Sequence, residues 1–515
     1  MKSPNFSPNF VCNIIALSGM LIGLTSTVLL SELSEAQLMS VGMGNWLSAF
    51  IQGPQIFGLL TGCLLAAIIG KTYGRRVAGI ASGILFILFA LSKFLEASSF
   101  LGMSGTFLGG TAAGTALLLM PIYIGEIAKP NYRGRFILLF FLYTILGITL
   151  SFGVQFFADS ASANDIVSIT LVVIAAIFSG CLYLIPKSPV WMYLNGYPKS
   201  ARKIIKQLGD EDYQEAWSTS LKELKKKPTE SVFTLSQFFE RGNRKKYTIT
   251  LVLILLLSVI GFQFFIPETA LTHQIYMEEL GAELDTGFLA SLIALGFALI
   301  SVLAVDRLGR KKVIASGVVL ASIGMILAGI SYQGAKYQWN DETAMEIVKY
   351  VEFEAKPGYS TALGDGRGIE FQRESDVVGH FMDRLPATDH AGFSRNKPFI
   401  ISQIIQFNHS LAFVGQLVVV AGFALGIGGM IFLLISEWIP KRAEMWHISA
   451  SGLLIVLVAT GVYYSVLGLE GLFNPSTWLF LSAGISIICL MIILILSKES
   501  TSLTLAQIDK LYQES

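Results

Sequence analysis

The charged residues that could do chemistry in this chain fall into a pattern that occurs twice. A glycine followed by two cations stands at 74–76, in GKTYGRR, and again at 309–311, in VDRLGRKK. Further along, each copy is followed by a glutamate and an arginine, in PIYIGEIAKPNYRG and in SEWIPKR. A carboxylate that faces arginines across short loops can hold neighbouring helices together, and breaking such pairs lets one bundle rock against another. The repeat therefore predicts two related bundles with a breakable latch.

The elements that position these charges are predicted to be membrane helices. Of the 515 residues, 53% are hydrophobic and 14% are charged, whereas soluble domains carry roughly 25% charged residues. The apolar residues gather in runs of about twenty, the length that crosses a bilayer as a helix. The net charge of +1 excludes a chain dominated by a nucleic-acid-binding field.

Twelve such runs predict an all-α polytopic membrane protein with twelve transmembrane helices. The spans lie near 11–30, 46–70, 77–96, 100–125, 136–157, 166–185, 247–267, 287–305, 313–332, 410–436, 448–468 and 476–497. Lys and Arg concentrate in the short loops of one side, which places both termini in the cytoplasm by the positive-inside rule. We therefore expect a multi-pass protein of the inner or plasma membrane.

Two long loops divide this chain. Residues 1–185 form a predicted N-terminal six-helix bundle, 186–246 a cytoplasmic helical linker, 247–497 a C-terminal six-helix bundle and 498–515 a cytoplasmic tail. The linker has apolar residues at helical spacing among charges, which favours a solvated helical linker over a lipid- or nucleic-acid-binding patch. The external loop at 333–399 is either a small folded cap or a partly disordered insert.

The repeated motifs resemble those of the sugar porter family of the major facilitator superfamily. The resemblance covers nearly the whole chain and includes IPKSPVWMYLNG after the sixth span and KESTSLTLAQI in the tail. It implies the major facilitator fold, in which two six-helix bundles enclose a central site reached alternately from each side. It also implies a cytoplasmic gate made of the charged residues of the motifs, namely Arg75, Arg76, Glu126, Arg133, Asp306, Arg310, Glu437, Arg442 and Glu499.

Several positions depart from the family pattern. Lys71 and Lys187 stand where the family usually has acids, so two charges of the N-terminal half are reversed. Proton-coupled members carry an Asp in the first helix and an Arg in the fourth, and here these positions are Thr25 and Thr106. A lone charge in mid-membrane is costly, so the loss of both is physically coherent.

The substrate-reading positions are altered too. The resemblance expects amides or a tryptophan where this chain has Phe141 and Phe432, so many hydroxyl-reading groups are missing. The residues that remain as candidates for substrate binding are polar or aromatic groups of cavity-lining helices, namely Gln155, Gln263, Glu268, Thr272, His273, Gln416 and Phe432. Glu268 and His273 could share a proton if they lie within the bilayer, but Pro267 favours their facing external water.

These observations predict a membrane transporter that moves a small polar solute, sugar- or polyol-like, by alternating access and facilitated diffusion. The alternatives are a proton-coupled symporter that uses another site, such as Glu268 and His273, and a non-transporting nutrient sensor. No nucleophile and base are assembled and no ATP-binding loop occurs, so we expect neither an enzyme nor a cofactor or metal site. The expected partners are the solute and the lipid bilayer, without nucleic acid, and the expected state is a monomer.

Overall fold

The computed structural model describes residues 6–38, 54–95, 99–158, 160–226, 241–262, 286–352, 358–438 and 475–513. Over these residues, ten helical stretches are long and apolar enough to cross a membrane. Ten of the twelve predicted spans correspond to these stretches, and the seventh corresponds to a further helix, α12. The predicted span at 448–468 lies outside the described residues.

Six long helices form the N-terminal half. They are α1 (Pro8–Leu38), α3 (Pro54–Thr72), α4 (Arg75–Leu95), α5 (Ser99–Gly125), α6 (Arg133–Phe157) and α7 (Ser160–Leu184), with the short η1 (Pro130–Tyr132) before α6. Side chains exposed on the outer helices are apolar, such as Ile68, Leu88 and Ile177. This distribution is expected of a bundle whose outer surface faces lipid instead of water.

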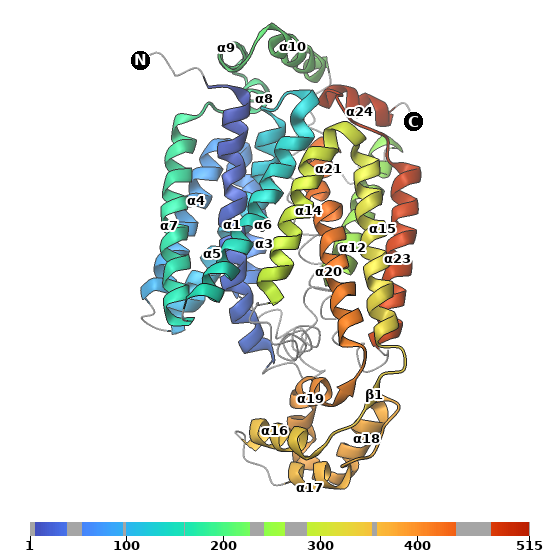
Figure 1. The fold of residues 1–515 in the computed structure, drawn as a ribbon. Helices are drawn as coiled ribbons and strands as arrows, with labels where there is room; N and C mark the ends of the chain where they lie inside the picture. Colours follow the sequence, from blue (N-terminus) through green and yellow to red (C-terminus); the bar gives the residue numbers. More distant parts are fainter. Residues whose placement is uncertain are drawn as a thin grey trace.

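The C-terminal half is built from a second set of long helices. They are α12 (Arg241–Phe262), α14 (Thr286–Leu308), α15 (Arg310–Ser331), α20 (His409–Leu425), α21 (Ile427–Trp438) and α23 (Pro475–Leu496). The predicted tenth span is broken at Gly426, where α20 ends and α21 begins. The two halves stand side by side with their long helices roughly parallel (Figure 1).

Helix pairs in both halves pack through glycines at backbone distance. A Cβ atom added at Gly58 of α3 would lie 2.2 Å from the carbonyl oxygen of Phe107 in α5. A Cβ atom added at Gly317 of α15 would lie 2.3 Å from Cα of Gly426. Because apolar side chains gain little by leaving lipid for a helix interface, such close backbone packing is a main source of association in membranes.

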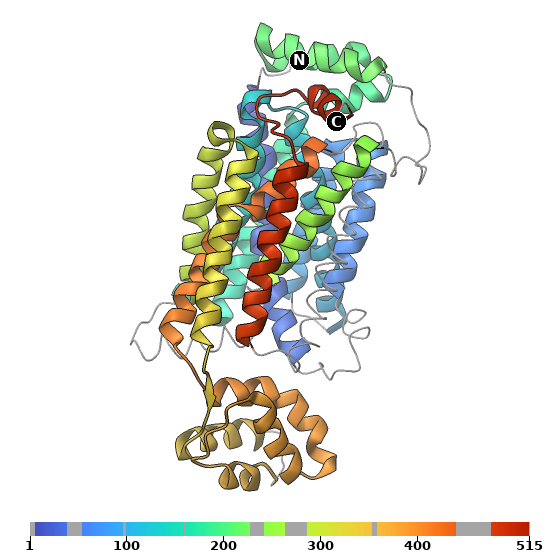
Figure 2. The ribbon, with the colours of Figure 1, turned by 90° about the vertical axis from the view of Figure 1, so that its right-hand side faces the viewer.

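Short helices cover one end of the bundle. The linker contains α8 (Pro189–Leu194), α9 (Pro198–Leu208) and α10 (Glu211–Lys226), and the tail contains α24 (Leu505–Gln513). All four lie at the same end of the long helices (Figures 1 and 2), which we call the linker side. Its helices alternate charged exposed residues with buried apolar ones such as Ile205 and Trp217.

The loop between α15 and α20 folds as a small unit at the opposite end, which we call the insert side. Its elements are β1 (Lys336–Tyr337), α16 (Asp341–Glu352), α17 (Gly358–Asp365), α18 (Glu374–Arg384), η2 (Ala387–Asp389), α19 (His390–Ile404) and β2 (Ile405–Gln406). The strands pair antiparallel, with Lys336 opposite Gln406. Figure 2 shows this insert beyond the ends of α15 and α20.

The insert has a hydrophobic core of its own. Trp339, Ile347, Phe381 and Ile400 are buried in it, and the Trp339 indole N–H donates to the carbonyl oxygen of Leu363 at 2.8 Å. The core continues into the ends of the membrane helices α15, α20 and α23. Of the two alternatives that the sequence left open, the structure has the folded cap, and it extends beyond residue 399 to the end of β2.

Candidate functional site

In the N-terminal half, a buried arginine and glutamate form a two-point ion pair. Gly74 has a φ of +92°, which ends α3 and lets α4 begin at Arg75. The Arg75 guanidinium donates to both carboxylate oxygens of Glu126, through Nη2 at 2.7 Å and Nε at 3.1 Å. Its Nη1 donates to the carbonyl oxygen of Gly70, and the Ser188 hydroxyl donates to Glu126. The pair therefore joins α3, α4, α5 and the residues that follow α7.

The C-terminal half repeats this arrangement with matching residues. Gly309 has a φ of +93°, and Arg310 is the first residue of α15. The Arg310 Nη2 lies 3.3 Å from Oε1 of Glu437 near the end of α21. The Ser500 hydroxyl donates to the other carboxylate oxygen of Glu437 at 2.6 Å. All three side chains are buried.

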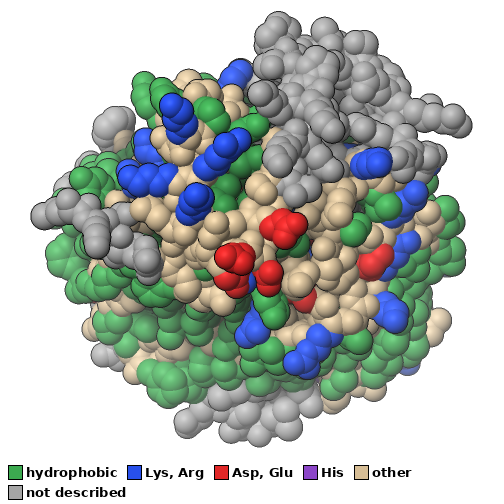
Figure 3. Space-filling view, turned by 90° about the horizontal axis from the view of Figure 1, so that it is seen from above, with side chains coloured by type: hydrophobic (Ala, Val, Ile, Leu, Met, Phe, Trp, Pro, Cys, Tyr) green, Lys and Arg blue, Asp and Glu red, His purple; other side chains and the backbone are tan. Residues whose placement is uncertain are grey.

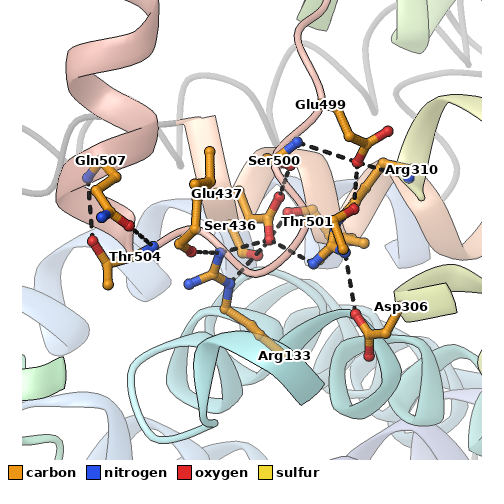
Figure 4. Close-up of polar contacts among 12 residues, drawn as sticks. Arg133, Asp306, Arg310, Ser436, Glu437, Glu499, Ser500, Thr501, Thr504 and Gln507 are labelled. Carbon is orange, nitrogen blue, oxygen red and sulfur yellow. Dashed lines mark hydrogen bonds and ion pairs between the residues drawn. The ribbon is translucent and has the colours of Figure 1, made fainter.

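Glu437 also binds an arginine from the other half of the molecule. Arg133, the first residue of α6, donates to Oε1 of Glu437 through Nη2 at 2.8 Å and Nε at 3.0 Å. The same Nη2 donates to the carbonyl oxygen of Leu503 in the tail at 2.9 Å. Figure 4 shows Glu437 between Arg133 and Arg310. One buried carboxylate thus joins two guanidinium groups, one from each half, and removing it would leave the buried Arg133 without an anion among the described residues.

A second contact between the halves lies beside the first. Oδ2 of Asp306 accepts the backbone N–H of Arg135, in the first turn of α6, at 2.8 Å, and Oδ1 lies 3.2 Å from Nη1 of Arg310. Gly134 permits this approach, because a Cβ atom there would lie 2.5 Å from Oδ1 of Asp306. A carboxylate at a helix N-terminus is favoured by the helix dipole.

The tail contributes a third carboxylate. Glu499 accepts the backbone N–H groups of Arg310 at 3.0 Å and of Lys311 at 3.3 Å, at the N-terminus of α15, and it accepts the Thr501 hydroxyl at 2.6 Å. Partial desolvation raises the pKa of Glu499, but these hydrogen bonds outweigh it and hold the pKa below the ordinary value. Glu499 is therefore ionised at neutral pH and caps α15.

Two of the predicted gate residues stand apart from these carboxylates. Nη1 of Arg76 donates to the carbonyl oxygens of Ile185, at 3.0 Å, and of Tyr183, at 3.4 Å, and so caps the C-terminal end of α7. Arg442 lies outside the described residues. The structure thus brings seven of the nine predicted gate residues into two neighbouring clusters, one in the N-terminal half and one across the halves.

Between the halves, the wall nearest this network is aromatic. The rings of Phe140 in α6 and Phe432 in α21 meet edge to face with centroids 5.5 Å apart. Phe141 and Phe423 make a similar contact at 6.2 Å. Phe432, predicted to bind substrate, therefore packs against the other half in this conformation.

The remaining predicted substrate residues are only partly placed. Gln155 in α6 and Gln416 in α20 are both half-buried. The other four candidates lie outside the described residues, namely Gln263, Glu268, Thr272 and His273. The described part of the central region thus offers two amides from opposite halves.

The positions of the missing proton couple are buried hydroxyls. Thr25 is fully buried, and its hydroxyl has no hydrogen-bond partner among the described residues. Thr106 donates to the carbonyl oxygen of Gly102 at 2.9 Å. The ammonium group of Lys93, near the end of α4, donates to the Thr106 hydroxyl at 2.9 Å. A cation from the neighbouring helix thus contacts the position where the family pattern has its arginine.

Sequence reasoning missed three polar contacts of these sites. Ser188 and Ser500 each donate to the central glutamate of their own half, and Lys93 reaches Thr106. Extending the comparison of the halves to the residues after the sixth and twelfth spans finds the serines, in IPKSP and in SKEST. Lys93 gives no such signal, because its partner is on another helix.

Comparisons with known proteins agree with this architecture. A family model described as "Sugar (and other) transporter" matches residues 10–352. The arabinose-proton symporter of Bacillus subtilis (strain 168) is 27% identical over 306 residues, which cover 56% of this chain and 64% of that protein. The D-xylose transporter of Levilactobacillus brevis is 25% identical over 354 residues, 66% of this chain and 74% of that protein.

The chain spans less than two thirds of the length of two Bacillus subtilis relatives. It covers 64% of the arabinose-proton symporter and 61% of a putative metabolite transport protein, which is 25% identical over 291 residues. Among solved structures, the proton:xylose symporter XylE bound to 6-bromo-6-deoxy-D-glucose is 18% identical, with a TM-score of 0.65 over 98% of both chains. The partially occluded inward-open form of XylE from E. coli gives a TM-score of 0.60 over 95% of this chain and 97% of that chain.

The solved structures, at this identity, establish the fold, and the family model establishes the family. Both agree with the arrangement of the long helices described above. This multi-span membrane protein has the major facilitator fold and belongs to the Sugar (and other) transporter family.

Proposed function

We propose that the protein moves a small polar solute, sugar- or polyol-like, across a cell membrane by alternating access, with its linker side in the cytoplasm. The observation that carries this proposal is the buried contact of Glu437 with Arg133 and Arg310, which ties the two halves together at the linker side. With this contact made, the linker side is closed. Breaking it opens that side as one half rocks against the other.

The energetics of this contact suit a switch. Guanidinium–carboxylate attraction in a buried site is strong, but it offsets a desolvation cost of similar size. When the halves separate, water enters and solvates the same charges, so the open and closed states can lie close in free energy. Serines, backbone carbonyls and the tail then tune the balance between them.

The proposed coupling mode is facilitated diffusion. Thr25 and Thr106 carry no charge, so the described part of the first and fourth spans holds no proton-carrying acid at those positions. A proton-coupled symporter is the second candidate, and two observations favour it: Lys93 contacts Thr106, and the named relatives include a proton symporter. Glu268 and His273 are the residues we propose for proton transfer in that case.

The solute class is proposed from the relatives and from the polar groups that remain. Gln155 and Gln416 can each donate to and accept from a hydroxyl, which is the pattern that sugars and polyols need. Phe140, Phe141 and Phe432 offer apolar ring faces, which suit the C–H faces of a sugar ring. We also propose that the protein acts as a monomer and is not an enzyme.

The test is uptake of radiolabelled arabinose, xylose, glucose and inositol into proteoliposomes, with and without a pH gradient. Facilitated diffusion predicts equilibration of one or more solutes that is unaffected by collapsing the gradient. Strict dependence on the gradient, abolished in Glu268→Gln, would overturn this mode and establish the symporter. Saturable binding without any uptake would instead identify a nutrient sensor.

A further inference from the structure

Three segments that carry cations meet near Trp191 at the linker-side rim of the N-terminal half. Lys187 places its ammonium group 5.7 Å from the centroid of the Trp191 ring. The indole N–H donates to the carbonyl oxygen of Lys71 at 2.9 Å, which holds the exposed end of α3 against the ring. Arg76, the second residue of α4, donates to the carbonyl oxygen of Ile185, two residues before Lys187. We call Lys71, Arg76 and Lys187 the rim cations.

The rim cations have no acidic partner among the described residues. The ion pairs found there are made by other lysines and arginines. Nε of Arg76 is buried and has no hydrogen-bond partner there. Asp210, the residue before α10, binds Lys129 and not a rim cation. The positive charge of the rim is therefore not neutralised within the described chain.

The corresponding positions of the C-terminal half carry acids. Asp306 precedes Arg310 by four residues, as Lys71 precedes Arg75. Glu499 directly precedes the serine that binds its glutamate, as Lys187 does. In that half the two carboxylates accept backbone N–H groups at helix N-termini. In the N-terminal half the same two positions are cations that make no such internal bond.

The rim also lies where lipid-facing surface ends. On α3 the exposed side chains Phe57, Leu64 and Ile68 follow one helix face, and Lys71 continues that face by one turn. On α7 the exposed face ends at Tyr183, which is 71% exposed, and Tyr73 beside the rim is 63% exposed. Tyrosines and lysines at the ends of apolar helix faces are typical of the headgroup level of a bilayer.

We propose that the rim cations bind the phosphate group of an anionic phospholipid in the leaflet on the linker side. The ammonium groups of Lys71 and Lys187 meet the phosphate, Arg76 adds a guanidinium N–H, and the exposed tyrosines lie among the glycerol and carbonyl groups. Figure 3 shows the linker-side face, where Lys and Arg side chains lie toward the left and right edges and most acidic side chains lie nearer the middle. Because the lipid contacts the outside of one half, its binding does not depend on the solute path.

The test is native mass spectrometry of the full-length, delipidated protein in a non-ionic detergent, titrated with dioctanoyl phosphatidylglycerol or dioctanoyl phosphatidylcholine. Wild-type protein is expected to bind phosphatidylglycerol at least tenfold more tightly. Lys71→Gln with Lys187→Gln is expected to lower that affinity about 30-fold, the factor for two cations near an anionic surface. Lys71→Asp with Lys187→Glu, which copies the charges of the C-terminal half, should abolish specific binding.

The matched control removes two cations from the same side of the molecule but from another helix. Lys199 and Lys203 are exposed on α9, and the variant Lys199→Gln with Lys203→Gln should keep its affinity within threefold. Equal losses in the two glutamine variants would overturn the site, since they would show general attraction to a basic face. Equal competition by glycerol 3-phosphate would also overturn it in favour of a free anion. Melting temperatures in phosphatidylcholine show whether each variant is folded.

Discussion

The linker-side ends of the two halves are built alike but are used differently. In each half an arginine follows a glycine of positive φ and begins a membrane span. It binds a glutamate at the end of the next membrane span, and a serine donates to the same glutamate. Three matched residues thus form a local unit twice. A duplicated unit of this kind holds each bundle together and needs no contact with the other bundle.

The difference is what each glutamate binds beyond its own unit. Among the described residues Glu126 receives donors from its own half, whereas Glu437 also receives Arg133 from the other half. The surrounding charges follow the same division, with acids at 306 and 499 and lysines at 71 and 187. The charged unit of the C-terminal half thus binds the other half, and the lysines of the N-terminal unit face solvent and lipid. The latch is therefore asymmetric although the repeat is symmetric.

Removing the shared carboxylate should have the largest effect. Glu437→Gln leaves the buried Arg133 guanidinium without an anion among the described residues and leaves Arg310 with Asp306 alone, which is expected to cost about 3–5 kcal/mol. The unfolding free energy in detergent measures this loss. Spin labels at exposed Tyr132 and Leu308, in a cysteine-free background, report the separation of the halves on the linker side.

Glu126→Gln is the control that sharpens the comparison. It breaks a buried pair of similar geometry but within one half, so the stability should fall by a similar amount while the distance between the two labels stays unchanged. If Glu126→Gln separates the labels as far as Glu437→Gln does, the assignment of the latch to the C-terminal unit is wrong.

Arg133→Gln should open the linker side while sparing the local unit. Arg310 and Ser500 still satisfy Glu437 in this variant, so the loss is confined to the contact between halves. Charge-assisted hydrogen bonds are each worth about 1.5–3 kcal/mol, which predicts a tenfold or greater shift toward the open population. The label distance measures it, and Arg75→Gln, which leaves the contact between halves intact, serves as the control with no expected shift.

Gly134→Ala tests the close approach of the halves by adding a single methyl group. Its Cβ atom would meet Oδ1 of Asp306 at 2.5 Å, so the Asp306 carboxylate must shift away from Arg135 and Arg310 or α6 must move, at a cost of about 1–3 kcal/mol. We expect a wider separation of the labels and slower uptake. Gly180→Ala is the matched change, because a Cβ atom there meets nothing within 4 Å, and a loss of uptake in that variant equal to the loss in Gly134→Ala would argue against a steric cause.

Features that depend on residues close together in the chain could be predicted from the sequence, and contacts between distant residues could not. The spans and the charged motifs are local patterns, and the structure describes helices at eleven of the predicted spans. Which arginine Glu437 binds is not a local property, since Arg133 is 304 residues away. The sequence also did not decide whether the insert folds, because its core contains residues from the ends of three membrane helices as well as its own few apolar residues.

The smallest predicted effect compares Glu499 with Lys187, its counterpart. Glu499→Gln removes a charge from the N-terminus of α15, and because the side chain is exposed, the expected loss of stability is about 0.5–1 kcal/mol at pH 7. The pKa of Glu499 is lower in the folded protein, so its contribution is present above the ordinary pKa and is lost as the pH falls through the folded value. Melting curves of wild type and Glu499→Gln should therefore differ at pH 7 and converge in acid. Lys187→Gln caps no helix and should show no such convergence, and a pH-dependent difference in that variant would mean that the two units are more alike than their contacts indicate.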